Sequence, residues 1–326
     1  MGAMHAICAR TGELSLVELP DPSPAAGEVQ ITVAAAGVNR ADLLQRTGHY
    51  PPPPGASDIL GLEVSGIITA LGPGVPDWQV GDEVCALLAG GGYATQVTVP
   101  AGQLLPVPRG VDLISASALP EVACTAWSNL VEVARLRAGE SVLVVGGSGG
   151  IGSHAIQLAA ALGARVVTTA GGPERVQRCL DLGADVALDH RALAGRELAC
   201  AVKEASGGGV DVILDVLGAG SLATHLASLA TGGRLVVIGM QQGRHGEIDL
   251  GRLLAKRASI HGTTLRSRSA QDKAEIVAAV QSHVWPLIEQ EQVRPVVHAV
   301  LPLRDAGRAH ELLDSGAVFG KVLLQV

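Results

Sequence analysis

The fold of this chain is decided by a glycine-rich stretch that reads VLVVGGSGGIG from Val142 to Gly152. An apolar run at 141–145 precedes the glycines, and a helical pattern at 153–162 follows them. Glycines let the backbone turn tightly and approach an anion closely, and the N-terminus of the following helix offers that anion free N–H groups and a positive dipole. The spacing Gly147-x-Gly149-x-x-Gly152 in this context predicts a site for the pyrophosphate of a dinucleotide.

The residues downstream alternate between strand and helix patterns. Strands are expected at 165–169, 185–188, 210–215, 234–238 and 259–262, and helices at 173–182, 196–205 and 221–229. This alternation predicts right-handed βαβ crossovers and a parallel sheet covered on both faces. We therefore expect a Rossmann domain over residues 121–265 in an α/β protein.

Both ends of the chain have a different pattern. Short β-runs at 14–19, 29–35 and 64–71 are broken by turns, and the proline run 51–54 excludes helix and central strand. After a long helical pattern at 270–290, β-runs return at 296–301 and 321–326. We expect residues 1–120 and 266–326 to form one mostly β catalytic domain.

Composition limits the classes of function. The chain has 326 residues, 48% of them hydrophobic and 2% aromatic, a net charge of −7 and a mean hydropathy of +0.34. The acidic balance argues against nucleic-acid and membrane-surface roles, and no apolar run of 18 residues lacks a charge or a turn breaker. The start of the chain has no signal-peptide pattern, and the five scattered cysteines predict buried, reduced thiols and a cytoplasmic location.

The end of the second Rossmann strand indicates which nicotinamide cofactor to expect. NAD enzymes usually place an acid there, whereas here Ala170, Gly171 and Gly172 follow the strand. Glu174 lies just beyond but is followed directly by Arg175, and His190 and Arg191 follow the third strand. A strand end without an acid and with cations nearby suits the 2′-phosphate of NADPH, so the sequence predicts NADPH as the cofactor. The alternatives are a solvated helix face for Arg175 and a loop position without a ligand for His190.

The glycine-rich stretch also fits a hydrolase pattern. Gly146-x-Ser148-x-Gly150 matches the G-x-S-x-G nucleophile elbow, which likewise lies between a strand and a helix. We interpret this match as a coincidence of a glycine-rich loop, because the dinucleotide fingerprint covers the same residues.

Segments along nearly the whole chain resemble one family. They include Gly37-Val38-Asn39-Arg40-Ala41-Asp42, Pro52-Pro-Pro54-Gly55, Gly81-Asp82-x-Val84 and Leu265-Arg266-Ser267-Arg268. They resemble the quinone oxidoreductase branch of the medium-chain dehydrogenase/reductase superfamily, and most closely its tumour-suppressor-inducible members and their bacterial relatives. The resemblance implies a partly open, barrel-like catalytic domain, a Rossmann domain, and an active site in the cleft between them.

The resemblance also bears on metal chemistry. The zinc-dependent members carry Cys where this chain has Gly37 or Asn39, and Gly-His-Glu where it has Gly61-Leu62-Glu63. Leu62 cannot bind zinc, so we predict no metal. Without a Lewis acid, the expected substrates are small molecules that accept hydride readily, namely quinones and α,β-unsaturated carbonyls.

By resemblance, three residues are catalytic candidates. Asn39 would hydrogen-bond near the nicotinamide ribose, Thr125 would place its hydroxyl against the nicotinamide, and Tyr50 would line the substrate cleft and donate to a quinone oxygen. The alternatives are an Asx-turn for Asn39, a helix-interior position for Thr125 and a packing role for Tyr50. Tyr93, in a glycine-rich turn, is expected to be structural.

The remaining candidates would contact the cofactor. Gly239 and Met240 follow the fifth strand, Leu265, Arg266 and Ser267 resemble a loop over the nicotinamide, and Lys321 resembles a residue that reaches the adenosine phosphate. Some relatives carry Ser in place of Gly149, Tyr in place of His190 and Lys in place of Arg175. The full predicted cofactor set is Gly147, Ser148, Gly149, Gly150, Ile151, Gly152, Gly171, Arg175, His190, Gly239, Met240, Leu265, Arg266, Ser267 and Lys321.

These observations predict an NADPH-dependent quinone oxidoreductase. One alternative is reduction of the C=C bond of enones or enoyl thioesters, and another is a non-catalytic relative of the crystallin or RNA-binding type. The acidic balance and the lack of a basic aromatic stripe argue against RNA. By resemblance we also expect a homodimer joined through the sheet edge at 259–262 or the segment before it.

Overall fold

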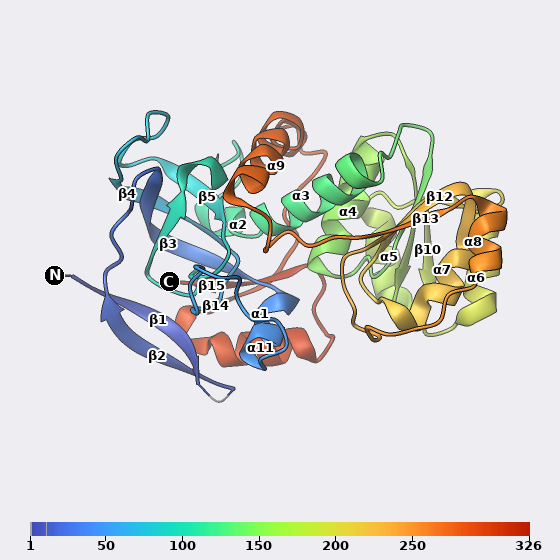
Figure 1. Ribbon diagram of the computed structural model, residues 1–326, viewed down its shortest axis with the longest axis horizontal. Coiled ribbons are helices and arrows are strands. Elements are labelled where there is room, and N and C mark those ends of the chain that lie inside the picture. Colours follow the sequence, from blue (N-terminus) through green and yellow to red (C-terminus); the bar gives the residue numbers. More distant parts are fainter. Residues whose placement is uncertain (1, 11) are drawn as a thin grey trace. The chain divides into compact units, whose positions relative to one another are not determined.

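The computed structural model describes residues 2–10 and 12–326, and the chain divides into two compact units (Figure 1). Unit 1 consists of Met1–Cys124, Leu265–Gln290 and Pro295–Val326, and unit 2 consists of Thr125–Thr264 and Glu291–Arg294. Both chain ends thus build unit 1, and the middle of the chain builds unit 2.

Unit 2 contains a six-stranded sheet in which every neighbouring pair is parallel. Its strands are β8 (Ser141–Val144), β9 (Arg165–Ala170), β10 (Val186–Asp189), β11 (Val210–Asp215), β12 (Leu229–Val237) and β13 (Ser259–Gly262). Their order is β10-β9-β8-β11-β12-β13, so the direction of winding reverses between β8 and β11. This is the Rossmann strand order, and ligands of such sheets bind where the order reverses.

Helices follow the strands of unit 2 as the alternation predicts (Figure 1). They are α4 (Gly150–Ala161), α5 (Pro173–Asp181), α6 (Gly195–Ser206), the short 3-10 segment Ala219–Ser221 with α7 (Leu222–Ser228), and α8 (Leu250–Lys256). Helix α3 (Pro120–Trp127) continues into a π-helical segment, Ser128–Val133, ahead of β8. The core is aliphatic, since small branched residues of the strands meet the buried faces of the helices.

A short return segment, Glu291–Arg294, also belongs to unit 2. The buried Gln157 amide on α4 holds it, accepting from Arg294 N at 3.0 Å and donating to Arg294 O at 3.1 Å. Two opposed hydrogen bonds from one amide imitate a β-ladder pairing, which explains how an isolated segment stays attached to the unit.

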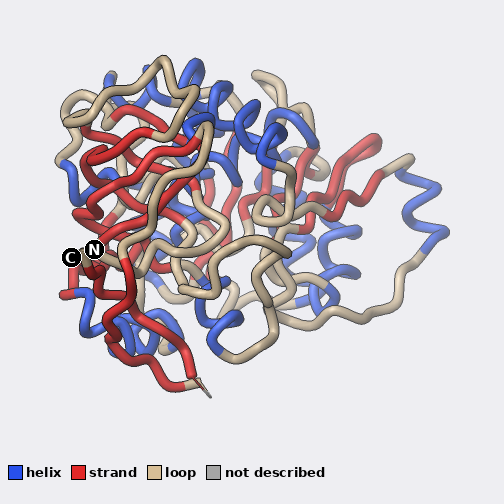
Figure 2. Tube along the Cα trace, turned by 60° about the vertical axis from the view of Figure 1, so that its left-hand side comes forward, coloured by secondary structure: helices blue, strands red, loops and turns tan. Residues whose placement is uncertain are grey.

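Unit 1 contains a seven-stranded sheet built around one long strand, β3 (Glu28–Val38). The other strands are β4 (Glu63–Leu71), β5 (Glu83–Leu87), β6 (Gln96–Pro100), β7 (Leu104–Pro106), β14 (Val297–Pro302) and β15 (Lys321–Gln325). Strand β6 pairs with the first half of β3 and β15 with its last residues, so the C-terminus completes a sheet that the N-terminal part begins. Figure 2 shows β1 (Ala3–Arg10) and β2 (Glu13–Pro20) as a separate two-stranded ribbon.

The helices of unit 1 differ from the sequence prediction in two places. The expected helix 270–290 is two helices, α9 (Ala270–His283) and α10 (Trp285–Glu289), because Pro286 lacks an N–H and starts a new helix. Helix α11 (Ala306–Asp314) was missed. The remaining helical segments are α1 (Arg40–Arg46), α2 (Leu113–Ala116), Ala101–Gln103 and Leu303–Asp305.

The predicted fold class is confirmed: a Rossmann unit is combined with a mostly β unit made from both chain ends. Among the described helices, none is both long and apolar enough to cross a membrane. The expectation of buried thiols holds for Cys85, Cys124 and Cys179, whereas Cys8 is half-buried and Cys200 is exposed, so the expectation is wrong for Cys200. Cys200 lies on the outer side of α6, away from the buried Ala199.

Candidate functional site

The glycine turn of unit 2 has the tight geometry that its sequence implies. Gly146 has φ +76°, in the left-handed region that favours glycine, and donates to Thr169 Oγ1 at 3.1 Å. Gly147 donates to Thr169 O at 2.9 Å, which anchors the turn to β9. A Cβ added at Gly147 would lie 2.2 Å from Thr168 Oγ1, so no larger residue fits at this position.

The beginning of α4 is packed equally closely against the turn. A Cβ at Gly152 would lie 2.2 Å from the carbonyl oxygen of Gly146, whereas a Cβ at Gly149 would meet the same oxygen at 3.5 Å, an ordinary contact. Gly149 is the N-cap and no side chain caps the helix. The first turn of α4 therefore offers its N–H groups to an external acceptor, and the turn fits a pyrophosphate. Ser148 and Ile151 lie in the same turn, both partly exposed.

Two basic side chains, those of His190 and Arg191, lie at the end of β9. A Cβ built on Gly171 would lie 3.0 Å from Arg191 Nε and 3.1 Å from His190 Nε2, so both side chains cover this glycine. The structure thus brings His190 and Arg191 together at Gly171. Arg175 lies half-exposed on α5.

An acid that the sequence argument did not weigh, Asp189, lies in the same loop. Its Oδ1 accepts from Gly172 N at 3.0 Å and from Arg191 N at 2.9 Å, and these bonds lower the pKa of its carboxyl. Asp189 pairs with Ala170 across the sheet, so the missing signal was the register of β10 against β9. Its Oδ1 accepts from the backbone and orients the loop that carries Arg191.

Gly239 and Met240 lie at the same carboxyl edge of the sheet, after β12. A Cβ at Gly239 would lie 2.7 Å from Val216 O, so glycine is required where this loop crosses the end of β11. The Met240 side chain is 61% exposed, so its predicted contact with the cofactor would be at the surface of unit 2.

In unit 1, Asn39 and Lys321 are part of a buried ionic network. Lys321 Nζ donates to Val38 O at 3.0 Å, to Asn39 Oδ1 at 2.7 Å and to the carboxylate of Glu63. Asn39 Nδ2 donates to Glu63 Oε1 at 2.9 Å, and Glu63 Oε2 accepts from Glu121 N at 2.9 Å. An ammonium has three donors and all three are used here, so the structure favours a structural role for Lys321 over the expected phosphate contact.

A second buried network lies beside the first. Asp42, fully buried, accepts from Asn39 N at 2.8 Å, Gly61 N at 3.1 Å and Tyr93 Oη at 3.1 Å. Burial raises the pKa of Asp42 to about 6. Tyr93 Oη also lies 3.1 Å from His310 Nε2, and burial lowers the pKa of His310 to about 4. Tyr93 is a buried structural residue, as its sequence context indicated.

Tyr50 and Arg266 meet in unit 1. The Arg266 guanidinium lies 5.3 Å from the centre of the Tyr50 ring and donates to Tyr50 O at 3.3 Å, Ala89 O at 2.8 Å and Gln45 Oε1 at 2.7 Å. Arg266 therefore fixes the segment of Tyr50 and the loop after β5 to each other. Leu265 is buried and Ser267 follows on the same loop.

Thr125 lies in unit 2, buried near the end of α3. Its carbonyl oxygen accepts from Asn129 Nδ2 at 2.8 Å, and Asn129 Oδ1 accepts from Thr263 Oγ1. Within each unit, the structure thus gathers the glycine turn, Gly171, His190 and Gly239 at one sheet edge, Asn39 with Lys321, and Tyr50 with Arg266. Among residues 2–10 and 12–326, no cluster of three His, Cys, Asp or Glu side chains could hold a metal ion.

The fold and the glycine turn define a dinucleotide-binding protein, and comparisons with known proteins give its family. The family described as zinc-binding dehydrogenase matches residues 150–282, and the family described as alcohol dehydrogenase GroES-like domain matches residues 25–109. Quinone oxidoreductase of Rattus norvegicus is 35% identical over 308 residues, which are 93% of this chain and 90% of that protein. The chain therefore belongs to the medium-chain dehydrogenase/reductase superfamily of oxidoreductases, and the assignment made from sequence is confirmed.

Two further relatives differ in kind. The phthioceranic/hydroxyphthioceranic acid synthase of Mycobacterium tuberculosis is 34% identical over 319 residues, and the chain spans 15% of the length of that synthase. The solved structure of a mycobacterial protein complexed with NADPH has a TM-score of 0.89 at 34% identity and covers 99% of this chain and 100% of that one.

Proposed function

We propose that this chain is an NADPH-dependent oxidoreductase that delivers a hydride to a quinone or a similar conjugated carbonyl compound. The observation that carries the proposal is the glycine turn between β8 and α4, where the positions of Gly147 and Gly152 exclude any Cβ. The turn lies where the strand order reverses, with His190 and Arg191 at the neighbouring strand end. A relative of the same fold is known in complex with NADPH.

In this proposal the chain's residues bind and orient. The N–H groups at the start of α4 hold the pyrophosphate, and Arg191 with His190 holds the 2′-phosphate. Bound NADPH supplies the hydride, and the protein supplies position and electrostatics. Tyr50, held by Arg266, is the candidate hydrogen-bond donor to the substrate oxygen.

A second candidate function is reduction of a C=C bond conjugated to a carbonyl. It is favoured by the relation to a mycobacterial acid synthase, of which the chain corresponds to 15%. Both reactions need a hydride donor and a donor of hydrogen bonds to the carbonyl oxygen, so the same residues serve either one.

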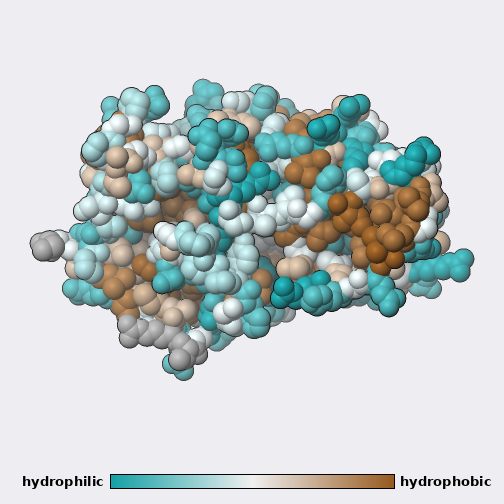
Figure 3. All heavy atoms as spheres, viewed as in Figure 1, coloured by the Kyte–Doolittle hydropathy of each residue, from teal (hydrophilic) through white to brown (hydrophobic). Residues whose placement is uncertain are grey.

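We also propose that the protein is a homodimer joined through unit 2. Strand β13 is the last strand of the six-stranded sheet. Figure 3 shows hydrophobic side chains gathered on unit 2, and Met240, Ile248, Leu250 and Leu254 are exposed there, Leu254 to 76%. Light scattering that gives the mass of one chain would contradict this arrangement.

The test of the function measures cofactor and substrate separately. NADPH and NADH are titrated by fluorescence, and then 1,2-naphthoquinone or a trans-2-enoyl thioester is added while absorbance of the reduced nicotinamide is followed. We expect NADPH to bind more tightly than NADH, with a preference that falls roughly tenfold in Arg191→Ala. Arg137→Ala is the matched control, because Arg137 is exposed ahead of the amino end of β8.

Each result assigns the function differently. Quinone-dependent oxidation supports the first candidate, and thioester-dependent oxidation without quinone turnover supports the second. Equal affinities for NADH and NADPH would refute the proposal that Arg191 and His190 bind the 2′-phosphate. If neither cofactor bound, the proposal of an oxidoreductase would be refuted.

A further inference from the structure

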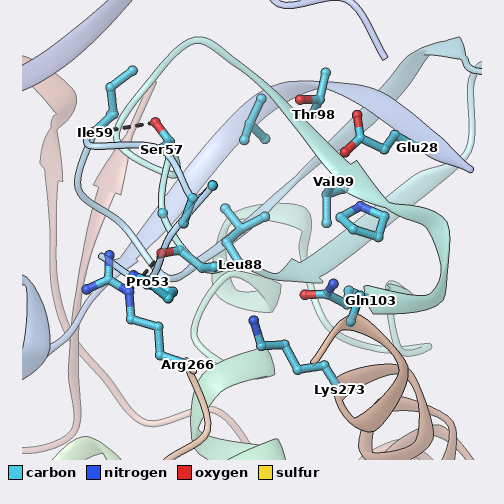
Figure 4. A pocket seen from close by; sticks show the side chains of 18 of the residues that line it. Glu28, Pro53, Ser57, Ile59, Leu88, Thr98, Val99, Gln103, Arg266 and Lys273 are labelled. Carbon is cyan, nitrogen blue, oxygen red and sulfur yellow. Dashed lines mark hydrogen bonds between the residues drawn. The ribbon is translucent and has the colours of Figure 1, made fainter. Parts of the chain in front are cut away.

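A cavity of about 720 Å³ lies wholly within unit 1 (Figure 4). Its walls are the proline-rich loop at 53–57, the loop 88–91 after β5, and the start of α9 with the residues ahead of it. Its volume is within the range of small-molecule binding sites. Three cationic side chains line it, Arg266, Arg268 and Lys273, although the chain as a whole carries a charge of −7.

Lys273 points into this cavity from the first turn of α9 (Figure 4). The residue is 5% exposed, and its ammonium makes no hydrogen bond and no ion pair within 4.0 Å in the part of the chain that the structure describes. Burial lowers its pKa, and the attraction of Glu121 opposes that shift without forming an ion pair. The chain supplies no acceptor for this ammonium where it opens onto the cavity, so an external anion can serve as its partner.

Gln103 presents a second unpartnered polar group to the cavity. It is 4% exposed, and its side-chain amide has no hydrogen bond to any described residue. The segment Ala101–Gln103 packs tightly against α9, since a Cβ at Gly102 would lie 2.9 Å from Ala274 Cβ. Figure 4 shows the Gln103 amide on the same side of the cavity as the Lys273 ammonium. Its N–H groups add donors for the same anion.

The hydrogen bonds of Arg266 do not neutralise its charge. Its three hydrogen-bond acceptors, on Ala89, Tyr50 and Gln45, are all neutral. Glu28, an acid that lines the cavity, lies away from Arg266 and Lys273 in Figure 4. The cavity therefore has a positive side at Arg266 and Lys273, and Arg266 connects that side to Tyr50.

We propose that this cavity binds a carboxylate or phosphate group of the substrate, with Lys273 and Gln103 as its direct partners and Arg266 as a second positive charge. The proposal rests on the function proposed above and narrows its substrate class. The preferred conjugated carbonyl compound carries an anionic chain, whose charged end lies at Lys273 while its reducible bond lies toward Tyr50.

The test uses one naphthoquinone scaffold with three side chains that end in a carboxylate, a phosphate or the methyl ester of the carboxylate. With NADPH as the cofactor, kcat/KM is measured for each compound, and the value for each anion is divided by the value for the ester. Because all three compounds share one ring, this ratio does not depend on the intrinsic reactivity of the ring. We expect the wild-type protein to prefer one anion by roughly ten- to hundredfold. Lys273→Met and Gln103→Leu should lower that ratio, and Lys273→Arg should retain part of it. Lys203→Met is the matched control, because Lys203 is exposed on α6.

Binding and stability are measured without turnover. Calorimetric titration with the carboxylate compound should show binding that Lys273→Met abolishes. In urea, Lys273→Met should be at least as stable as the wild type, because it removes a charge that makes no hydrogen bond or ion pair with the described part of the chain. If Lys273 instead stabilised the fold through a partner, the variant would unfold at lower urea.

The outcomes separate the two proposals. Equal kcat/KM for anions and ester refutes the anion site and leaves the reductase function intact. Lys273-dependent binding of the carboxylate without any reduction supports the anion site and refutes the function. A clear preference for carboxylate or for phosphate identifies which anion the cavity takes.

Discussion

Replacement of Gly152 by alanine tests the proposed cofactor site at its most crowded point. Alanine is the better helix former by about 1 kcal/mol, so helix propensity alone predicts that Gly152→Ala stabilises α4. The structure predicts the opposite, because the new Cβ would lie 2.2 Å from the carbonyl oxygen of Gly146. The two groups must separate by roughly 1 Å to reach ordinary contact.

The turn cannot open without further loss. The Gly146 carbonyl accepts from Gly149 N at 3.0 Å, and a movement of about 1 Å breaks this bond, which is worth about 1 kcal/mol. Overpacking of this kind costs about 1–3 kcal/mol. Because the turn and the start of α4 hold the pyrophosphate, we expect NADPH affinity to fall roughly 5- to 150-fold.

The assay is fluorescence titration of NADPH together with urea unfolding. Gly149→Ser is the matched control, since its Cβ would meet Gly146 O at an ordinary 3.5 Å and the backbone φ is −78°. We expect this variant to fold normally and to bind NADPH at least as well as the wild type. Near-normal NADPH binding by Gly152→Ala, within about twofold, would refute the close approach of helix and turn.

Three further predictions concern the buried charges. Lys321→Met leaves the fully buried Glu63 without its cation and should lower the free energy of unfolding by about 3–5 kcal/mol in urea, whereas unchanged stability would refute the role of that pair. Burial lowers the pKa of His154 to about 4, so the unfolded chain binds more protons than the folded chain between about pH 4 and 6.5, and stability falls as the pH drops through that window. His154→Leu should reduce this loss of stability by up to about 3 kcal/mol, while His310 continues to contribute a loss of its own. The free energy of unfolding in urea is compared at pH 7 and pH 4.5. Asp42 has the opposite effect, because its pKa is raised to about 6 in the folded protein, so its contribution to stability is lost as the pH rises from about 4 through 6. Asp42→Asn should therefore make the free energy of unfolding fall more steeply as the pH drops through this range. An unchanged dependence of stability on pH would contradict the raised pKa.

The Rossmann unit was predictable because its information is local. The glycine turn, the apolar runs and the helices of about ten residues each show in a short window of sequence, and the strand order follows from the handedness of the crossovers. The register of β10 against β9 is not local, which is why Asp189 was missed although it lies opposite Ala170. The return segment Glu291–Arg294 was unpredictable for the same reason, since a single amide, Gln157, holds it.

Arg266 was among the residues predicted from sequence, but Lys273 and Gln103 of the same cavity were not. Lys273 follows a serine-capped helix start and has the pattern of an ordinary solvated lysine, and Gln103 lies in a loop between two strands. Only the packing of Ala101–Gln103 against α9 brings both residues to the wall of one cavity. Burial without a partner is a property of three-dimensional structure, and no spacing along the chain reports it.

Residues of unit 1 bear on the prediction that the protein binds no zinc. In the sequence, Leu62 stands where zinc-dependent relatives carry a zinc ligand. The structure shows that the Glu63 carboxylate occupies the space where a side chain at Gly37 would lie. A Cβ at Gly37 would lie 2.3 Å from Glu63 Oε1, so a cysteine there is incompatible with the present position of that carboxylate. The Glu63 carboxylate is neutralised by Lys321, and Asn39 bonds to both. A metal ligand at Gly37 would therefore require displacing a buried ion pair as well as changing the residue, which is a second argument, independent of Leu62, for the prediction that no zinc binds here.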